Sequence, residues 1–212
     1  MIMRQEAQNF WDWFSIRNHA YRHLETETEE RKTLLLEELR ANLQTYCDKL
    51  FFEIGGQAAD EPELIITAEG NTEFFRQAEE LVAAAPKVGN WLFRALIPPR
   101  GSDFQIGIDG FVLNASTLWF QPMGHPALPE LNGLRVCIPQ YGTLKAKEWL
   151  QPVISKIVEY ILGEKTYALD VHYIEVAELP EAPVEWGMFP LPRLIKFLAW
   201  RKAKAQEQIR YN

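Results

Sequence analysis

The sequence predicts an α+β fold, in which a mainly antiparallel sheet of about six to eight strands is packed with two N-terminal helices and further helices. Three observations support this fold class. The first fifty residues carry apolar side chains at three- and four-residue spacing, which is typical of helices. Residues 63–99 read as strand, turn, helix, loop and strand. After them, short apolar runs separated by turn residues indicate consecutive antiparallel strands.

The helical start has two parts. An aromatic stripe from Glu6 to Leu24 predicts a first helix with one face to bury. Thr26 followed by Glu29 fits a capping box, which predicts a second helix running to Leu50. We therefore expect residues 1–50 to form a helical N-terminal part.

The segment 51–99 supplies the first strands. The apolar runs Phe51–Ile54 and Leu64–Ile66 predict a hairpin. Gly70 is expected to adopt a positive φ in the following turn, with Asn71 or Thr72 capping a helix that ends at Ala85 before a proline. Residues 91–97 are apolar on both faces except for Arg94, which predicts a strand inside the sheet.

Residues 104–178 complete the predicted sheet. Short strands are expected at 104–109, 111–113, 117–121 and 134–138, with a Pro- and Gly-rich loop over 122–133. A helix is expected over 145–162, closed by Gly163, and a strand over 167–176. A proline-rich linker and a last helix over 193–208 end the chain, so the whole of 1–212 is predicted to be one domain with parts 1–50, 51–178 and 179–212.

Composition limits the function classes. The 212 residues carry a net charge of −7, which argues against a nucleic-acid-binding surface. The two cysteines, Cys47 and Cys137, are too few for a disulfide framework and favour a reducing compartment. No stretch resembles a signal peptide or a membrane-spanning helix, so we expect a cytoplasmic protein without a transmembrane segment.

Four polar residues are candidates for a catalytic cleft. Glu69 ends one predicted strand and Arg94 lies on its neighbour, where the two charges could pair across a turn. Asp170 and His172 alternate on one face of the predicted late strand, and a carboxylate beside an imidazole can form a general base. If the four side chains share a cleft, the chain would be a small hydrolase-like enzyme. Motifs for a nucleophile elbow or a phosphate loop are absent.

Metal and cofactor binding have little support in the sequence. His19, His23 and Glu27 are spaced at i, i+4 and i+8, which would place them on one face of a continuous helix. The capping box at Thr26 argues that the helix breaks before Glu27. We expect neither a metal nor a cofactor.

The leading functional hypothesis is a non-enzymatic protein-binding or regulatory module. Aromatic residues are abundant, and interfaces concentrate their binding energy in Trp, Tyr and Arg. We therefore expect some of five tryptophans to lie on an exposed patch: Trp11, Trp13, Trp119, Trp186 and Trp200. The basic C-terminal helix could contact an acidic partner, and the aromatic first helix could mediate self-association.

Several short motifs resemble those of an uncharacterised family of bacterial proteins. They are Phe10-Trp11-x-Trp13-Phe14, the turn over 65–71, Ala85-Pro86 before Trp91, and Leu162-Gly163-Glu164. The similarity spans most of the chain. It implies a bacterial cytoplasmic protein, and it transfers no catalytic residue because the family has no established activity.

Overall fold

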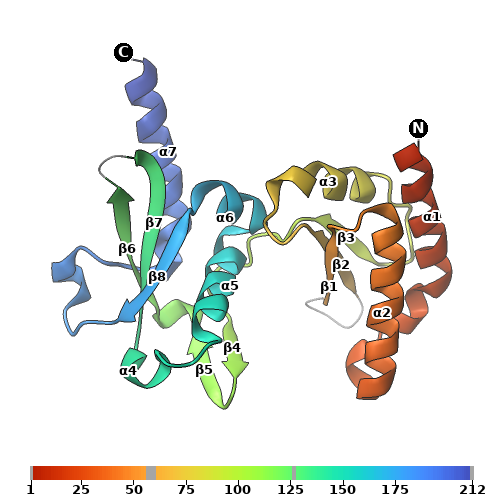
Figure 1. Ribbon diagram of the computed structural model, residues 1–212, viewed down its shortest axis with the longest axis horizontal. Helices are drawn as coiled ribbons and strands as arrows, with labels where there is room; N and C mark the ends of the chain where they lie inside the picture. The colour runs from red at the N-terminus through yellow and green to blue at the C-terminus, as the bar shows by residue number, and fades with distance from the viewer. Residues whose placement is uncertain (1, 56–60, 126–127, 211–212) are drawn as a thin grey trace. The chain divides into compact units, whose positions relative to one another are not determined.

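The computed structural model describes residues 2–55, 61–125 and 128–210. The chain divides into two compact units, Met1–Ile97 and Pro98–Asn212. The α+β class is confirmed, but the single sheet of six to eight strands is wrong, because the strands form sheets of three, two and four (Figure 1). The three- and four-stranded sheets each contain one parallel pair of strands, and the remaining described pairs are antiparallel. The single-domain organisation stays a prediction.

The first unit is a three-stranded sheet with helices. Its elements are, in chain order, α1 Ile2–Arg17, η1 Asn18–Tyr21, η2 Leu24–Thr26, α2 Glu29–Tyr46, β1 Phe51–Gly55, β2 Glu63–Thr67, η3 Thr72–Phe74, α3 Phe75–Ala83 and β3 Leu92–Ala95, where η marks a 3-10 helix. The hairpin of β1 and β2 is confirmed, whereas β3 pairs with β2 in parallel through the α3 crossover.

Local capping explains where these helices begin. The second helix starts two residues later than the sequence predicts, because the Thr28 hydroxyl, rather than that of Thr26, accepts from the Arg31 N–H. Gly70 takes the expected positive φ of 79°, and the Asn71 side chain accepts from the Glu73 N–H. The turn between β2 and α3 is therefore structural.

Aromatic packing joins α1 to the sheet and to α3. The Trp11 ring lies 4.5 Å from that of Phe93 on β3, and Phe14 lies 5.6 Å from the same ring. The Trp11 indole N–H donates to the Leu81 carbonyl of α3 at 2.8 Å, so its one polar atom is satisfied while its ring is buried. The predicted aromatic stripe is thus part of the core of its own unit.

Tyr46 at the end of α2 provides a pH test of this unit. Its hydroxyl donates to the Gln77 carbonyl at 3.1 Å, and burial raises its pKa from 10.0 to about 12. The folded protein therefore holds this proton to a higher pH than the unfolded chain does. We predict that this contribution, on the order of 1–3 kcal/mol, is present below pH 10 and is lost between pH 10 and 12.

Chemical denaturation of the wild type and of Tyr46→Phe across pH 9–12 measures this effect. Phenylalanine has no proton to lose, so the stability of the variant should decline less steeply over this window. Parallel declines for the two proteins would contradict the prediction.

The second unit contains a hairpin and a four-stranded sheet. Its elements are β4 Gln105–Ile108, β5 Phe111–Asn114, η4 Ala115–Thr117, β6 Trp119–His125, β7 Leu128–Ile138, α4 Tyr141–Leu144, α5 Leu150–Leu162, α6 Glu164–Asp170, β8 Tyr173–Glu178, η5 Pro183–Trp186, β9 Phe189–Pro190, η6 Leu191–Arg193 and α7 Leu194–Arg210. The sheet order is β8-β7-β6-β9, with β7 and β8 parallel and the other pairs antiparallel.

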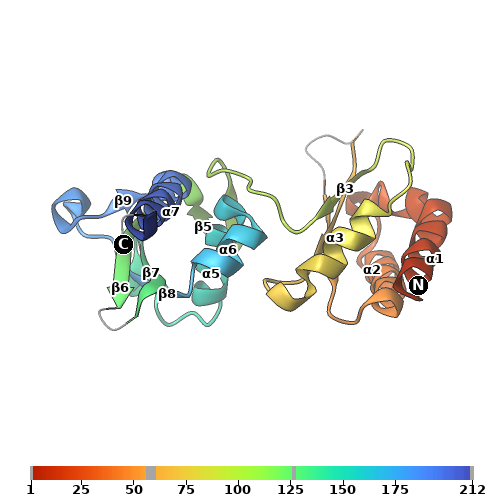
Figure 2. The same ribbon diagram turned by 90° about the horizontal axis from the view of Figure 1, so that it is seen from above.

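The two faces of this sheet differ in polarity. Phe120, Leu134 and Val136 on one face belong to the same buried core as Ile154 of α5 and Leu194 of α7. Helix α7 runs along one side of β6 and β7 (Figure 2). The register aligns three polar residues, Gln121, Arg135 and Glu175, on neighbouring strands. The Arg135 Nη1 donates to Gln121 Oε1 at 3.1 Å, and its Nε lies 3.2 Å from Glu175 Oε1.

Three sequence predictions are wrong in this unit. The expected loop over 122–133 is largely strand. Pro122 pairs with Leu134 of β7, and β9 pairs only with Trp119 and Phe120, so no described strand needs a main-chain donor on the β9 side of Pro122. The helix expected from Lys145 begins only at Leu150. The strand expected over 167–176 is helix α6 up to Asp170, followed by β8 from Tyr173.

Gly163 separates α5 from α6, with a positive φ and an extended ψ of 150°. Its φ is 78°, and a Cβ added there would lie 2.8 Å from the Pro99 ring. Glycine is therefore required for two reasons, because L-residues disfavour this φ and because the added atom has no space. The predicted helix end is confirmed, and α6 begins at the next residue, Glu164.

A pair of substitutions compares Gly163 with a glycine in open space. Gly187 has a φ of 68° and a ψ of 27°, a left-handed conformation, with nothing within 4 Å of an added Cβ. Gly187→Ala should cost about 1–2 kcal/mol of unfolding free energy from backbone strain alone. Gly163→Ala should cost at least ~1 kcal/mol more, because its φ of 78° and ψ of 150° suit glycine alone and because the added atom meets Pro99, and urea denaturation would measure both losses. Equal losses for the two variants would contradict this prediction.

Candidate protein-interaction surface

The first predicted polar pair does not form. Glu69 is exposed in the turn after β2, with a φ of 50°, and its backbone N–H donates to the Thr67 hydroxyl. The Arg94 guanidinium instead pairs with Glu63 at the start of β2. The register of β2 against β3 explains this ion pair. Glu63 is opposite Leu92, and Arg94 lies only two residues further along β3.

Asp170 and His172 also interact with other residues. Asp170 ends α6 and its carboxylate lies 2.5 Å from Lys202 Nζ of α7. His172 precedes β8, and its Nδ1 accepts from the Asn132 N–H at 2.9 Å. The premise that both lie on one strand face is wrong, because α6 extends through Asp170. A cleft shared by all four predicted residues stays a prediction: Glu69 and Arg94 belong to the first unit, Asp170 and His172 to the second.

The histidine spacing does not produce a helical ligand face. Helix α1 ends at Arg17, His19 lies in η1, and His23 lies between η1 and η2, with both imidazoles exposed. Among the described residues, no group of three or more His, Cys, Asp or Glu side chains is arranged to hold a metal ion. None of the described helices is long and apolar enough to cross a bilayer.

The tryptophans separate into buried and exposed sets. Trp11 is fully buried and Trp13 and Trp119 are half-buried, whereas Trp186 and Trp200 are 65% and 57% exposed. The expectation that some tryptophans are exposed is therefore confirmed, and both exposed ones lie in the C-terminal part. Their surroundings differ, because only Trp200 has a ring contact within the described part of the chain.

A row of aromatic rings connects Trp200 to the core. Phe120 of β6 is fully buried, and its ring lies 5.7 Å from Phe189 of β9 and 5.5 Å from Phe197 of α7. Phe189 and Phe197 stack at 6.0 Å, and Phe197 lies 5.9 Å from Trp200. These separations are those of favourable aromatic pairs. Trp200 is thus held on a rigid base rather than on a mobile loop.

Basic side chains lie beside the exposed end of this row. Lys196, Trp200 and Lys204 are at i, i+4 and i+8, so they share one face of α7. Lys204 Nζ lies 5.2 Å from the centre of the Trp200 ring, within the range of a cation–π interaction. Lys202 points to the other side of the helix, toward Asp170. We call the set Phe189, Lys196, Phe197, Trp200 and Lys204 the α7 surface.

The α7 surface has the chemistry of a binding site for an acidic segment. Lys196 and Lys204 have no ion-pair partner within residues 2–55, 61–125 and 128–210. An incoming carboxylate would meet unpaired ammonium groups, and an incoming apolar side chain would cover the exposed Trp200 ring. The basic helix and Trp200 were predicted from sequence, whereas Phe189 was missed because it lies between two prolines in a segment expected to be irregular.

Comparisons with known proteins add no identity. The chain matches no protein-family model, no curated protein and no solved structure. The resemblance to an uncharacterised bacterial family therefore stays a prediction.

Proposed function

We propose that this chain is a non-enzymatic protein-binding module that binds an acidic segment of another protein through the α7 surface. The observation that carries the proposal is Trp200, which is 57% exposed at the end of a packed row of rings and is flanked by Lys196 and Lys204. Tryptophan residues on rigid supports are typical centres of binding energy.

The net charge supports this assignment. The chain carries −7 overall, so a local cluster of unpaired lysines attracts an acidic ligand against a background that repels it. Such an arrangement gives orientation as well as attraction during encounter. The same background disfavours nucleic acid, whose recognition needs a broad basic face.

Self-association through the first helix has lost its structural support. Phe10, Trp11 and Phe14 of the aromatic stripe are 2% exposed or less, so they offer little area to a second copy. For the compartment, we propose the bacterial cytoplasm, in keeping with Cys47 and Cys137 as free thiols.

Photocrosslinking in cells of the source organism tests the proposal. A benzophenone amino acid at Ala203, an exposed residue on α7, should form an adduct with a partner protein, whereas the same group at Leu34, which is exposed on α2, should not. Trp200→Ala should reduce the Ala203 adduct at least fivefold, because most of the exposed apolar contact area is lost. The double variant Lys196→Glu/Lys204→Glu should reduce it as strongly by repelling an acidic segment.

Trp186→Ala is the matched control, since Trp186 is similarly exposed but makes no aromatic-ring or cation–π contact within the described structure. Its adduct should remain within twofold of wild type. An adduct that survives Trp200→Ala and the charge reversal, or loss of the adduct in all variants alike, would contradict the assignment to the α7 surface.

A further inference from the structure

The hairpin of β4 and β5 has a free edge whose geometry is set by its turn. Asp109 and Gly110 have φ values of 51° and 77° and form the whole loop between Ile108 and Phe111. Two residues with positive φ make a type I′ turn, in which the flanking residues form a hydrogen-bonded pair.

Antiparallel pairing then determines where the main-chain groups of Val112 point. Hydrogen-bonded pairs alternate with non-bonded pairs, so Ile106 and Leu113 form the next bonded pair after the turn. The Ala115 N–H donates to the Phe104 carbonyl at 3.1 Å, which continues the same alternation. Val112, between the bonded positions, therefore directs its N–H and C=O away from β4.

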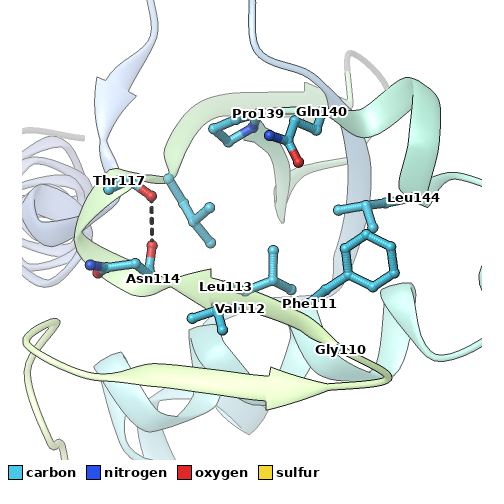
Figure 3. Close-up of a pocket in the computed structure, with 10 residues that line it drawn as sticks. Gly110, Phe111, Val112, Leu113, Asn114, Thr117, Pro139, Gln140 and Leu144 are labelled. Atoms are coloured by element: carbon cyan, nitrogen blue, oxygen red, sulfur yellow. Dashed lines mark hydrogen bonds between the residues drawn. The ribbon is translucent and has the colours of Figure 1, made fainter.

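A pocket of about 330 Å³ lies along this edge. Figure 3 shows β4 on one side of β5 and the turn at Pro139 and Gln140 on the other. The buried side chains Leu113, Leu118 and Leu144 line it, with exposed positions at its rim. None of the residues that line it is charged. The volume is at the lower end of the range of ligand-binding pockets, about 300–1,000 Å³.

Two sets of polar groups in the pocket are free to bind a ligand. The Asn114 carbonyl is already bonded to the Thr117 hydroxyl at 2.9 Å, the contact dashed in Figure 3. The main-chain groups of Val112 and the side-chain amide of Gln140 have no partner within the described parts of the chain. Gln140 also has a φ of 59°, a strained value for a residue other than glycine, and its own carbonyl accepts from the Thr143 N–H.

We propose that this pocket binds an extended, uncharged segment of a partner polypeptide, which adds to β5 as a strand. A donor and an acceptor on one residue of a free edge match the main chain of an added strand. The four residues of β5 extend roughly 13 Å, so the added segment is short. An apolar side chain of that segment would enter the leucine-lined pocket, and the Gln140 amide would bond its main chain.

The absence of charge in the lining argues for this occupant over an ionic small molecule, which would be left without a counter-charge. The inference is independent of the α7 surface. That surface carries lysines and exposed rings, and it uses side chains, whereas the β5 edge uses main-chain groups.

Selection from a phage-displayed library of random eight-residue peptides tests the proposal with the full chain. The library is first depleted on Val112→Pro, which removes the outward N–H without breaking a bond to β4, and is then selected on the wild type. We expect surviving peptides that are uncharged and rich in β-branched or apolar residues. Their dissociation constants, measured by fluorescence anisotropy, should rise at least tenfold for Val112→Pro.

Matched controls identify the edge. Gly107→Pro removes the equivalent outward donor on β4, the opposite edge of the same hairpin, and should change affinity less than twofold. Trp200→Ala should also leave it unchanged. Gln140→Gly relieves the strained φ while removing the amide, so it should weaken binding several-fold without lowering the melting temperature.

A measurement on the peptide covers the case in which Val112→Pro fails to fold. In that event the library is selected on the wild type without depletion, and each selected peptide is N-methylated in turn at its backbone amides. Methylation should abolish binding at one alternate set of positions only, as strand addition requires. The proposal would be overturned if binding tolerates N-methylation at every position, or if no peptide is selected. It would also be overturned if light scattering shows a wild-type dimer that Val112→Pro converts to a monomer.

Discussion

The packing of Phe120 beneath Phe189 and Phe197 is the constraint on which the C-terminal unit depends. Phe120 is fully buried in the sheet face that α5 and α7 cover, and the two other rings close over it from β9 and α7. Because close-packed rings allow few alternative positions, this contact determines how α7 lies on the sheet. The directions of the described α7 side chains follow from it.

The same contact explains why one helix can serve both stability and binding. Leu194 and Leu198 face the core, Lys202 reaches Asp170, and the remaining face presents Lys196, Trp200 and Lys204. A binding residue held by a packed ring loses little conformational freedom when a partner arrives, which is the advantage of a preorganised surface. The ion pair of Lys202 with Asp170, at the end of α6, fixes the helix from the opposite side. It also leaves Asp170 engaged in structure rather than available beside His172.

Sequence reasoning was successful where the signal is local. The positive φ of Gly70, the end of α5 at Gly163 and the β1–β2 hairpin are set by a few adjacent residues, and each was predicted. Sequence reasoning failed where one stretch of residues fits both the two-residue period of a strand and the period of a helix. The alternation of Tyr167, Leu169 and Val171 is that of a strand. A helix nevertheless begins at Glu164, because Gly163 ends α5 and its carbonyl accepts the first bond of α6 from the Tyr167 N–H. Strands β7 and β8 pair although α5 and α6 lie between them in the sequence, and no local sequence pattern specifies such a pairing.

By itself, the sequence determined the α+β class, most helices, the basic character of α7 and the presence of candidate binding tryptophans. Only the tertiary structure decided which tryptophan is available, since Trp11 is covered by Phe93 while Trp200 is left at the surface. It also decided that Arg94 pairs with Glu63 and that the edge of β5 has no strand partner among the described residues. The physical reason is that helix periodicity and turn chemistry are properties of neighbouring residues, whereas burial, ion pairing and strand edges depend on which distant segments meet.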